Sequence, residues 1–197
     1  MTGSRRFSQA ISEGDGISLV AAVAAPEDAR TAEGAGAEAL LVWSGRGRDL
    51  RAIREASSLP ILVYWDGEHA AALEGADACL VEVHGERDRD LVENAQLELG
   101  GRFELALQIE DEEHLASALE DFDPELFVLA AREGGDEEPL ERVLDLLPDV
   151  PAGKLAIAQL PSLSAEDVAA LERAGVDGVI VGAGDVAELA GDAARPA

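Results

Sequence analysis

The stretch from Ser164 to Gly182, SAEDVAALERAGVDGVIVG, contains one complete helix–turn–strand unit. Ser164 and Asp167 have the spacing of a capping box, which predicts that a helix begins between them. Gly175 stands where this helix should end, since helices commonly stop at a glycine in the left-handed conformation. The turn phrase GVDG then leads into the β-branched run Val179–Val181, which predicts a buried strand.

Similar units fill the rest of the chain. The turn phrase recurs in related form at Gly36–Ala39 and Gly75–Ala78, each time before a β-type run. Hydrophobic patterning predicts eight strands: Ser18–Val23, Ala39–Trp43, Ile61–Trp65, Ala78–Val83, Glu104–Ile109, Leu126–Ala130, Leu155–Ala158 and Val179–Val181. Helical patterning falls between them: Pro26–Gly34, Gly47–Ala56, Glu68–Glu74, Asp88–Leu99, Glu112–Asp121, Glu138–Leu147 and Ala165–Ala174, with an eighth segment near Asp185–Ala194.

Strands that are joined by single helices must run parallel, because each crossover brings the chain back to the same edge. Eight strand–helix units favour a closed (β/α)8 TIM barrel over an open doubly wound sheet. The whole chain has only 197 residues, which makes this barrel unusually compact. We expect an N-terminal segment over residues 1–16 and a single barrel domain over 17–197.

The charge balance excludes several classes of function. The chain has 41 Asp and Glu against 15 Lys and Arg, a net charge of −26, and Lys154 is its only lysine. Such an acidic surface repels phosphate backbones and anionic lipid headgroups, so we expect no nucleic-acid partner and no membrane partner. Many carboxylates with almost no lysine fit either a salt-adapted cytoplasm or a GC-rich genome. Self-repulsion favours a monomer over an oligomer.

The N-terminal sequence and the single cysteine point to a cytoplasmic protein. Residues Met1–Gly16 lack the apolar core of a signal peptide, and the longest apolar run, Ile17–Ala25, is too short to span a bilayer. Cys79 has no partner for an internal disulfide and lies in an apolar run, so we expect it in the core. No Cys or His spacing typical of a metal site occurs, and we expect no metal and no cofactor.

Alternation along the strands identifies the side chains that could line the mouth of the barrel. In a TIM barrel the site lies at the carboxyl ends of the strands, and outward positions are strongly apolar. Val81 and Val83 should then face the helices, which leaves Glu82 and His84 facing inward as a possible acid–base pair. The same reasoning gives the full candidate mouth: Tyr64, Asp66, Glu82, His84, Gln108, Glu110 and Arg132. His69 and His114 fall in helices and are expected at the surface.

A short glycine phrase after the last strand suggests an anion site. Gly182-Ala183-Gly184-Asp185 precedes the eighth helical segment, and backbone N–H groups at a helix N-terminus favour a phosphate. Barrels of this class commonly hold phosphate here. Asp185 would repel the phosphate unless its side chain points away, and a simple turn with two glycines is the alternative.

The sequence resembles indole-3-glycerol phosphate synthase, a (β/α)8 lyase of tryptophan biosynthesis. The similarity covers Phe7 to about Val186. Its markers are Phe7–Ile11, Ile17–Ala21, Ser58–Leu62, Gly75–Ala78, Asp111–Leu115, Ala165–Val168 and Val179–Gly182. The resemblance implies a barrel that closes an indole ring on an anilino-deoxyribulose phosphate, with loss of CO₂ and water. That reaction needs lysines and carboxylates that manage protons around a carbonyl and an amine.

The chain departs from this family at its catalytic positions. Where the family has lysine, glutamate or asparagine, this sequence has Ala22, Ala24, Tyr64, Gln108, Ala130 and Gln159. Gln108 keeps the shape of a glutamate without its proton, and neither Ala24 nor Tyr64 can replace an amine as a general acid near neutral pH. Arg132 and the first phosphate glycine, Gly182, are retained. We therefore expect that the family reaction is absent.

Three functions remain open. The first is a catalytically inactive barrel, as a relic, a scaffold or a binder of a small phosphorylated metabolite through Gly182, Ala183 and Gly184. The second is an enzyme with changed chemistry built from Glu82, His84, Glu110 and Arg132. The third is a partner-binding protein that uses an outer helix face, which should display a contiguous apolar patch.

Overall fold

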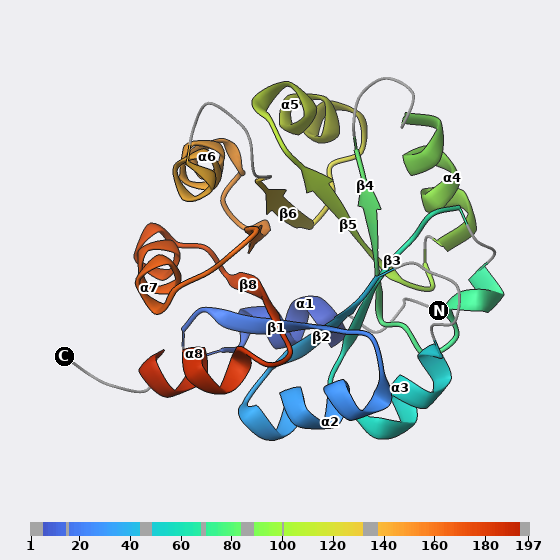
Figure 1. The fold of residues 1–197 in the computed structure, drawn as a ribbon. Coiled ribbons are helices and arrows are strands. Elements are labelled where there is room, and N and C mark those ends of the chain that lie inside the picture. Colours follow the sequence, from blue (N-terminus) through green and yellow to red (C-terminus); the bar gives the residue numbers. More distant parts are fainter. Residues whose placement is uncertain are drawn as a thin grey trace.

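The protein is a closed barrel of eight parallel strands that follow one another in chain order (Figure 1). The computed structural model describes residues 6–14, 16–43, 49–67, 70–83, 89–99, 101–131 and 138–193. The strands are β1 (Ser18–Val23), β2 (Ala39–Val42), β3 (Ile61–Tyr64), β4 (Ala78–Glu82), β5 (Glu104–Ile109), β6 (Leu126–Ala130), β7 (Leu155–Gln159) and β8 (Gly178–Gly182). The (β/α)8 fold expected from the count of units is confirmed.

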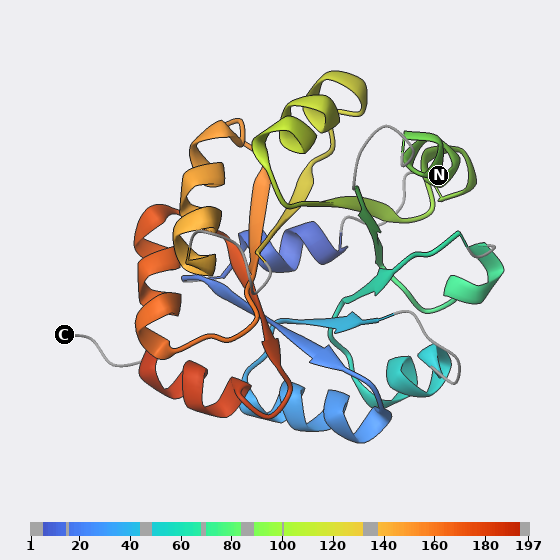
Figure 2. The same cartoon turned by 45° about the horizontal axis from the view of Figure 1, so that its top comes forward.

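Helices surround this barrel and cover the outer side of its strands (Figures 1 and 2). They are α2 (Pro26–Ala35), α3 (Leu50–Ala56), α4 (Arg89–Leu99), α5 (Glu112–Asp121), α6 (Pro139–Leu146), α7 (Ala165–Ala174) and α8 (Val186–Ala193), whereas α1 (Arg6–Ser12) lies across one end of the barrel. Two short 3-10 turns, η1 (Ala70–Leu73) and η3 (Leu147–Asp149), complete the described elements.

The capping box and the terminal glycine that the sequence predicts for α7 are both present in the structure. The Ser164 side chain accepts from the Asp167 backbone N–H, and the Asp167 carboxylate accepts from the Ser164 backbone N–H, which completes the capping box. Gly175 ends the helix at φ 96°, a conformation that an L side chain rarely adopts. The turn phrase thus begins where the helix must stop.

The expected helix at Glu68–Glu74 is wrong. The described part of this segment is the single 3-10 turn η1. Gly67 and Gly75 adopt φ 93° and 105°, left-handed conformations that an α-helix does not contain and that bound this short segment on both sides. His69 lies outside the described residues.

The acidic residue of the turn phrase ties neighbouring strands together. Asp77 Oδ2 accepts from the backbone N–H of Ile61, the first residue of β3, at 2.9 Å. Asp177 Oδ2 accepts in the same way from Ala156 of β7 at 2.8 Å. In each case the carboxylate just before one strand holds the start of the preceding strand. The recurring phrase is therefore a repeated structural device at the amino ends of the strands.

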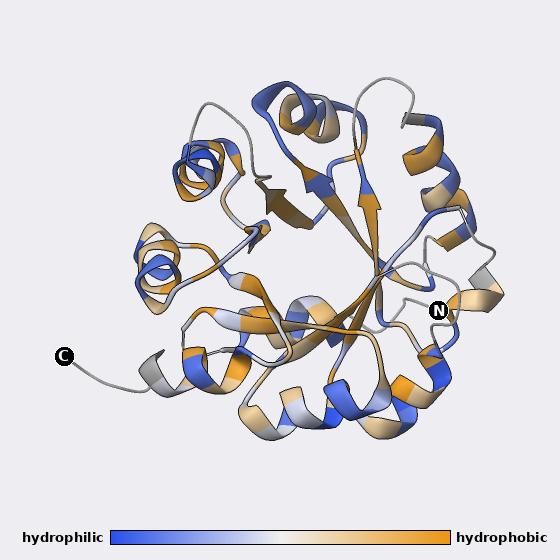
Figure 3. Ribbon diagram, in the orientation of Figure 1, coloured by the Kyte–Doolittle hydropathy of each residue, from blue (hydrophilic) through white to orange (hydrophobic). Residues whose placement is uncertain are grey.

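Successive side chains of each strand point to opposite faces of the sheet, and this alternation produces two separate hydrophobic cores. The outward side chains of the strands, Val81, Val83 and Cys79 among them, pack in one large cluster under the helices. The inward side chains form a second cluster inside the barrel. Figure 3 shows the strands mostly in apolar colours and the polar residues gathered on the helices. The expected inward and outward parity of β4 is confirmed by these clusters.

The strand register arranges the inward residues in layers of four from alternate strands. Three successive layers contain no polar side chain. From the amino end upward they are Ala39, Ala78, Leu126 and Gly178; then Val20, Leu62, Ala106 and Ile157; then Leu41, Leu80, Val128 and Ile180. Below them the inward Ser18 is polar and fully buried, and above them polar side chains occur again in the next layer, toward the carboxyl ends of the strands.

Helix α1, which the sequence patterning does not predict, closes the amino end of the barrel. Phe7 (0 % exposed) and Ile11 (2 %) pack into the inner cluster beneath the lowest layer. The Glu104 carboxylate accepts from the backbone N–H groups of Phe7 (2.8 Å) and Ser8 (3.1 Å) at the start of α1. A carboxylate in this place satisfies N–H groups that a helix leaves unpaired and favours its dipole.

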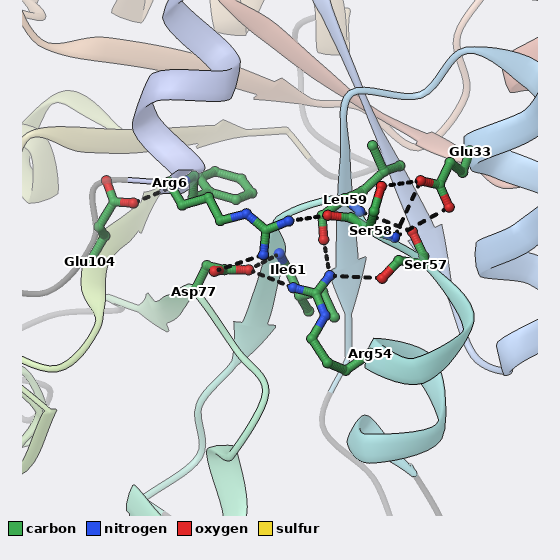
Figure 4. A network of polar contacts seen from close by, with 10 residues as sticks. Arg6, Glu33, Arg54, Ser57, Ser58, Leu59, Ile61, Asp77 and Glu104 are labelled. Carbon is green, nitrogen blue, oxygen red and sulfur yellow. Dashed lines mark hydrogen bonds and ion pairs between the residues drawn. The ribbon is translucent and has the colours of Figure 1, made fainter.

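A polar network extends from α1 around this closed end (Figure 4). Asp77 pairs with Arg54 at 3.1 Å and with Arg6 at 3.5 Å. Both arginines also donate to backbone carbonyls before β3, Arg6 to Ser58 and Arg54 to Ser57 and Leu59. The network therefore fixes the start of α1 and the entry to β3 at the end opposite the candidate mouth.

Candidate functional site

The fourth layer of inward side chains forms the floor of the mouth. It consists of Ala22 (β1), Tyr64 (β3), Gln108 (β5) and Gln159 (β7), the residues one step above Val20, Leu62, Ala106 and Ile157 on the same strands. Four positions at which the resemblance implied catalytic groups thus lie at one height. None of the four side chains is charged near neutral pH.

A rim of four residues from the even-numbered strands lies above this floor. It consists of Trp43, Glu82, Ala130 and Gly182. Apart from the Tyr64 hydroxyl, Glu82 carries the one ionisable group among these eight floor and rim residues. The small residues Ala22, Ala130 and Gly182 leave the β1, β6 and β8 side of the mouth with little side-chain volume.

Glu82 is held by two neighbours from the floor. The Tyr64 hydroxyl donates to Glu82 Oε2 at 2.6 Å, and Gln108 Nε2 donates to Glu82 Oε1 at 3.3 Å. Each carboxylate oxygen thus receives a donor from an adjacent strand. A charged acceptor with such partners makes stronger hydrogen bonds than a neutral one. The side chain that alternation identified as inward is therefore a fixed carboxylate at the mouth.

Two amide oxygens of the floor are buried without a donor. Gln108 is 4 % exposed, and its Oε1 has no hydrogen-bond partner among the described residues. Gln159 is half-buried, and its Oε1 is in the same situation. A buried polar atom without a partner costs free energy, so natural structures rarely leave one unless water or a ligand satisfies it. Both oxygens belong to the same layer.

An aromatic pair borders the carboxylate. The ring centroids of Trp43 and Tyr64 lie 5.8 Å apart with an interplanar angle of 42°. Trp43 is 39 % exposed, whereas Trp65, directly after β3, packs in the outer cluster and is 2 % exposed. Trp43 is not among the residues that the sequence predicts for the mouth. Its parity with the inward residues Ala39 and Leu41 is the signal that could have identified it.

The other candidate residues are spread more widely. Glu110 lies one residue past β5 and lines a cleft of about 320 Å³ between the start of α5 and α6, together with Asp111, Glu112, Glu113, Arg142, Asp145 and Leu146. Asp66 is exposed beyond β3. His84 and Arg132 lie outside the described residues. The described contacts therefore unite Glu82 with Tyr64 and Gln108.

His114 differs partly from the expectation of a surface residue. Its side chain is 21 % exposed, and Nδ1 lies 2.9 Å from Asp111 Oδ2. Asp111 is also the N-cap of α5, where its Oδ1 accepts from the His114 backbone N–H at 2.8 Å. The contact between the two side chains follows from this cap, because His114 is the third residue after the N-cap and lies beside it in the first turn of α5. His114 has a local structural contact on an outer helix.

The glycine phrase after β8 forms a tight turn into α8. The Asp185 backbone N–H donates to the Gly182 carbonyl at 3.0 Å. The Asp185 carboxylate folds back over Gly182, so closely that a Cβ at Gly182 would meet Oδ2 at 2.6 Å. Gly182 and Gly184 are exposed and Ala183 is half-buried. Glycine at position 182 therefore makes room for the protein's own carboxylate at the place considered for phosphate.

Within the described ranges, no three His, Cys, Asp or Glu side chains are arranged to hold a metal ion. A search of the same ranges finds no helix that is both long and apolar enough to cross a membrane. The large apolar side chains recorded as exposed are Trp43 at the rim and Leu97 on α4, at 83 %. They lie on separate elements and form no shared apolar patch in the described part of the chain.

A scan against models of known protein families gives no match, and a comparison with curated proteins gives none either. The class of this protein is therefore defined by its architecture: it is a compact (β/α)8 barrel. A TIM barrel supports many unrelated functions, so its activity has to be argued from the mouth.

Proposed function

We propose that this protein binds a small polar molecule at the carboxyl end of its barrel and does not perform the indole-3-glycerol phosphate synthase reaction. The observation that carries the proposal is the composition of the floor. Ala22, Tyr64, Gln108 and Gln159 replace the ionisable groups that the reaction requires. The fixed Glu82 above them can orient a ligand, and the donorless amide oxygens can bind one.

The catalytic half of the proposal has a direct test. The purified protein is incubated with the anilino-deoxyribulose phosphate substrate of the family, and indoleglycerol phosphate is measured. We expect no turnover above a buffer blank, because no lysine lies in the floor or rim to act as general acid. Turnover above the blank that is lost on Glu82→Gln would contradict the proposal.

The binding half is tested by the melting temperature of the protein in the presence of small amines, polyols and sugar phosphates. A ligand of the mouth should raise the melting temperature of the native protein, because it binds the folded state alone. The rise should disappear in Gln159→Met, which removes one floor acceptor at a half-exposed position. Ligands whose effect survives this change bind elsewhere.

A phosphorylated metabolite at the glycine phrase is the second candidate. The exposed Gly182 and Gly184 before α8 favour it, since backbone N–H groups near a helix N-terminus can approach an anion. The position of the Asp185 carboxylate beside Gly182 weighs against it. A melting-temperature rise with ribose 5-phosphate that is lost in Gly184→Asp would support this candidate. No rise in any sugar phosphate would reject it.

A further inference from the structure

We infer that the ligand of the mouth is a small organic cation that carries N–H donors, an amine or a guanidine, held between Glu82, the amide oxygens of Gln108 and Gln159, and the ring of Trp43. This inference rests on the proposed function, since it assumes that the mouth holds a small molecule. It adds the chemical class of that molecule.

The charge of Glu82 and of the molecule as a whole favours a cation. Glu82 is a carboxylate whose oxygens accept hydrogen bonds from Tyr64 and Gln108. The molecule as a whole carries −26. Such a field concentrates cations and repels phosphate esters.

The hydrogen-bonding groups of the floor select for donors. Gln108 already uses Nε2 to donate to Glu82, which leaves its Oε1 as an acceptor. Gln159 Oε1 is a second acceptor in the same layer. Amide oxygens accept N–H groups and repel phosphate oxygens. A ligand with N–H donors could satisfy such an oxygen, whereas a quaternary ammonium ion could not.

The aromatic rim suits the same ligand. Trp43 is 39 % exposed beside Tyr64, and a tryptophan face attracts a cation placed within about 6 Å of it. Tyr64 serves both sides of the site, because its ring contacts Trp43 while its hydroxyl holds Glu82. A planar guanidinium could stack on the indole and keep its N–H groups directed at the acceptors.

The experiment compares three probes on the whole protein. Methylguanidinium has N–H donors, tetramethylammonium has the same charge without them, and ribose 5-phosphate is an anion. Binding is followed by tryptophan fluorescence, because the chain has two tryptophans and only Trp43 is exposed. We expect saturable quenching by methylguanidinium that is absent in Trp43→Phe, and at least about tenfold weaker binding of tetramethylammonium.

Matched variants assign the binding to the mouth. Glu82→Gln keeps the shape of the side chain and should weaken methylguanidinium about tenfold or more, while Gln159→Met should weaken it about threefold to tenfold. Glu120→Gln removes the same charge from an exposed position of α5 and should stay within about twofold. Near-ultraviolet circular dichroism of each variant verifies that the barrel is intact.

The possible results separate this inference from the proposed function. Equal affinity for methylguanidinium and tetramethylammonium, or an equal loss in Glu120→Gln and Glu82→Gln, would overturn the donor-bearing cation and indicate general charge attraction. Binding of ribose 5-phosphate that depends on Gln159 would overturn the cation and support the proposed function. If neither these probes nor a broader set of amines, polyols and sugar phosphates binds in a Gln159-dependent way, both the cation inference and the proposed binding function are wrong.

Discussion

The hydroxyl of Tyr64 donates to the carboxylate of Glu82 at 2.6 Å, and the two residues come from adjacent strands at the mouth of the barrel. Tyr64 occupies a position where the resemblance implied a catalytic lysine. A lysine there would bring a mobile proton and a positive charge to the carboxylate, whereas the phenol brings one directed hydrogen bond. The mouth is consequently built to hold Glu82 in place.

Replacement of Tyr64 by Phe should lower the free energy of unfolding by about 1–2 kcal/mol, because the half-buried Glu82 loses one donor. In a Glu82→Gln background the same replacement should cost less, since the lost hydrogen bond is no longer made to a charged group. Urea unfolding of the four proteins of this double-mutant cycle measures the coupling. A coupling of zero would mean that the two side chains do not interact in solution.

Replacement of Asp77 by Ala should destabilise the protein by about 2–4 kcal/mol. Its carboxylate is 14 % exposed, so the change leaves Arg54 and the Ile61 N–H without their shared acceptor. Asp77→Asn should cost less, because the amide oxygen can still accept from Ile61. Asp149→Ala, at an exposed position, is the control and should change stability by less than about 0.5 kcal/mol. Equal effects of Asp77→Ala and the control would contradict this role.

Asp177 should make stability depend on pH in the direction opposite to a salt-bridged acid. Burial raises the pKa of Asp177, and the hydrogen bond from the Ala156 N–H offsets this only in part. The folded state therefore binds the proton more tightly than the unfolded state, and stability is lost as pH rises from the unfolded value of about 3.9 through the folded one.

Asp177→Asn keeps an oxygen that can accept from Ala156 and removes this titration. Its stability relative to the native protein should increase from pH 3 to pH 6 and remain constant above that. Denaturation midpoints of both proteins across this range measure the difference. A relative stability that falls with rising pH would show that the pKa of Asp177 is lowered in the folded state.

Glu33 provides the contrasting case at the same end of the barrel. The Ser58 hydroxyl donates to its carboxylate and lowers the pKa of Glu33, against a smaller effect of burial. A lowered pKa contributes stability that is present above the unfolded value and lost as the pH falls through the folded one. Because Glu33 is only partly buried, Ser58→Ala should reduce stability at pH 7 by at most about 1 kcal/mol and by less at pH 3.

Much of the fold could be read from the sequence because its signals are local. Caps, turn glycines and strand alternation depend on a few neighbouring residues, and they located eight strands and the inward direction of Glu82. The partners of Glu82 depend on the stagger between β3, β4 and β5, which no single strand reveals. Trp43 was missed for the same reason, since its contact with Tyr64 joins two strands.

Helix α1 was missed because only two of its seven residues, Phe7 and Ile11, are fully buried, and its stability depends on contacts far along the chain. The residues that fix its start are Glu104 and Asp77, about 97 and 71 positions away respectively. A seven-residue helix has little stability of its own. Sequence periodicity cannot detect an element that tertiary contacts create.

Phe7 should be as important to the barrel as any strand residue. It is fully buried below the lowest layer, so Phe7→Ala removes a large apolar side chain and leaves a cavity at the closed end. We expect a loss of about 3–5 kcal/mol, measured by urea unfolding. Leu97→Ala, at an 83 % exposed position on α4, should cost less than about 0.5 kcal/mol.

The Phe7→Ala variant also distinguishes a helix that only docks on the barrel from one that is part of its cooperative unit. If α1 belongs to the cooperative unit, Phe7→Ala lowers the midpoint of a single transition while fluorescence and circular dichroism remain coincident. If α1 only rests against the barrel, it should detach first and the main transition should keep its midpoint. We expect the single transition, because Phe7 contacts the inner core and Glu104 ties the start of the helix to β5.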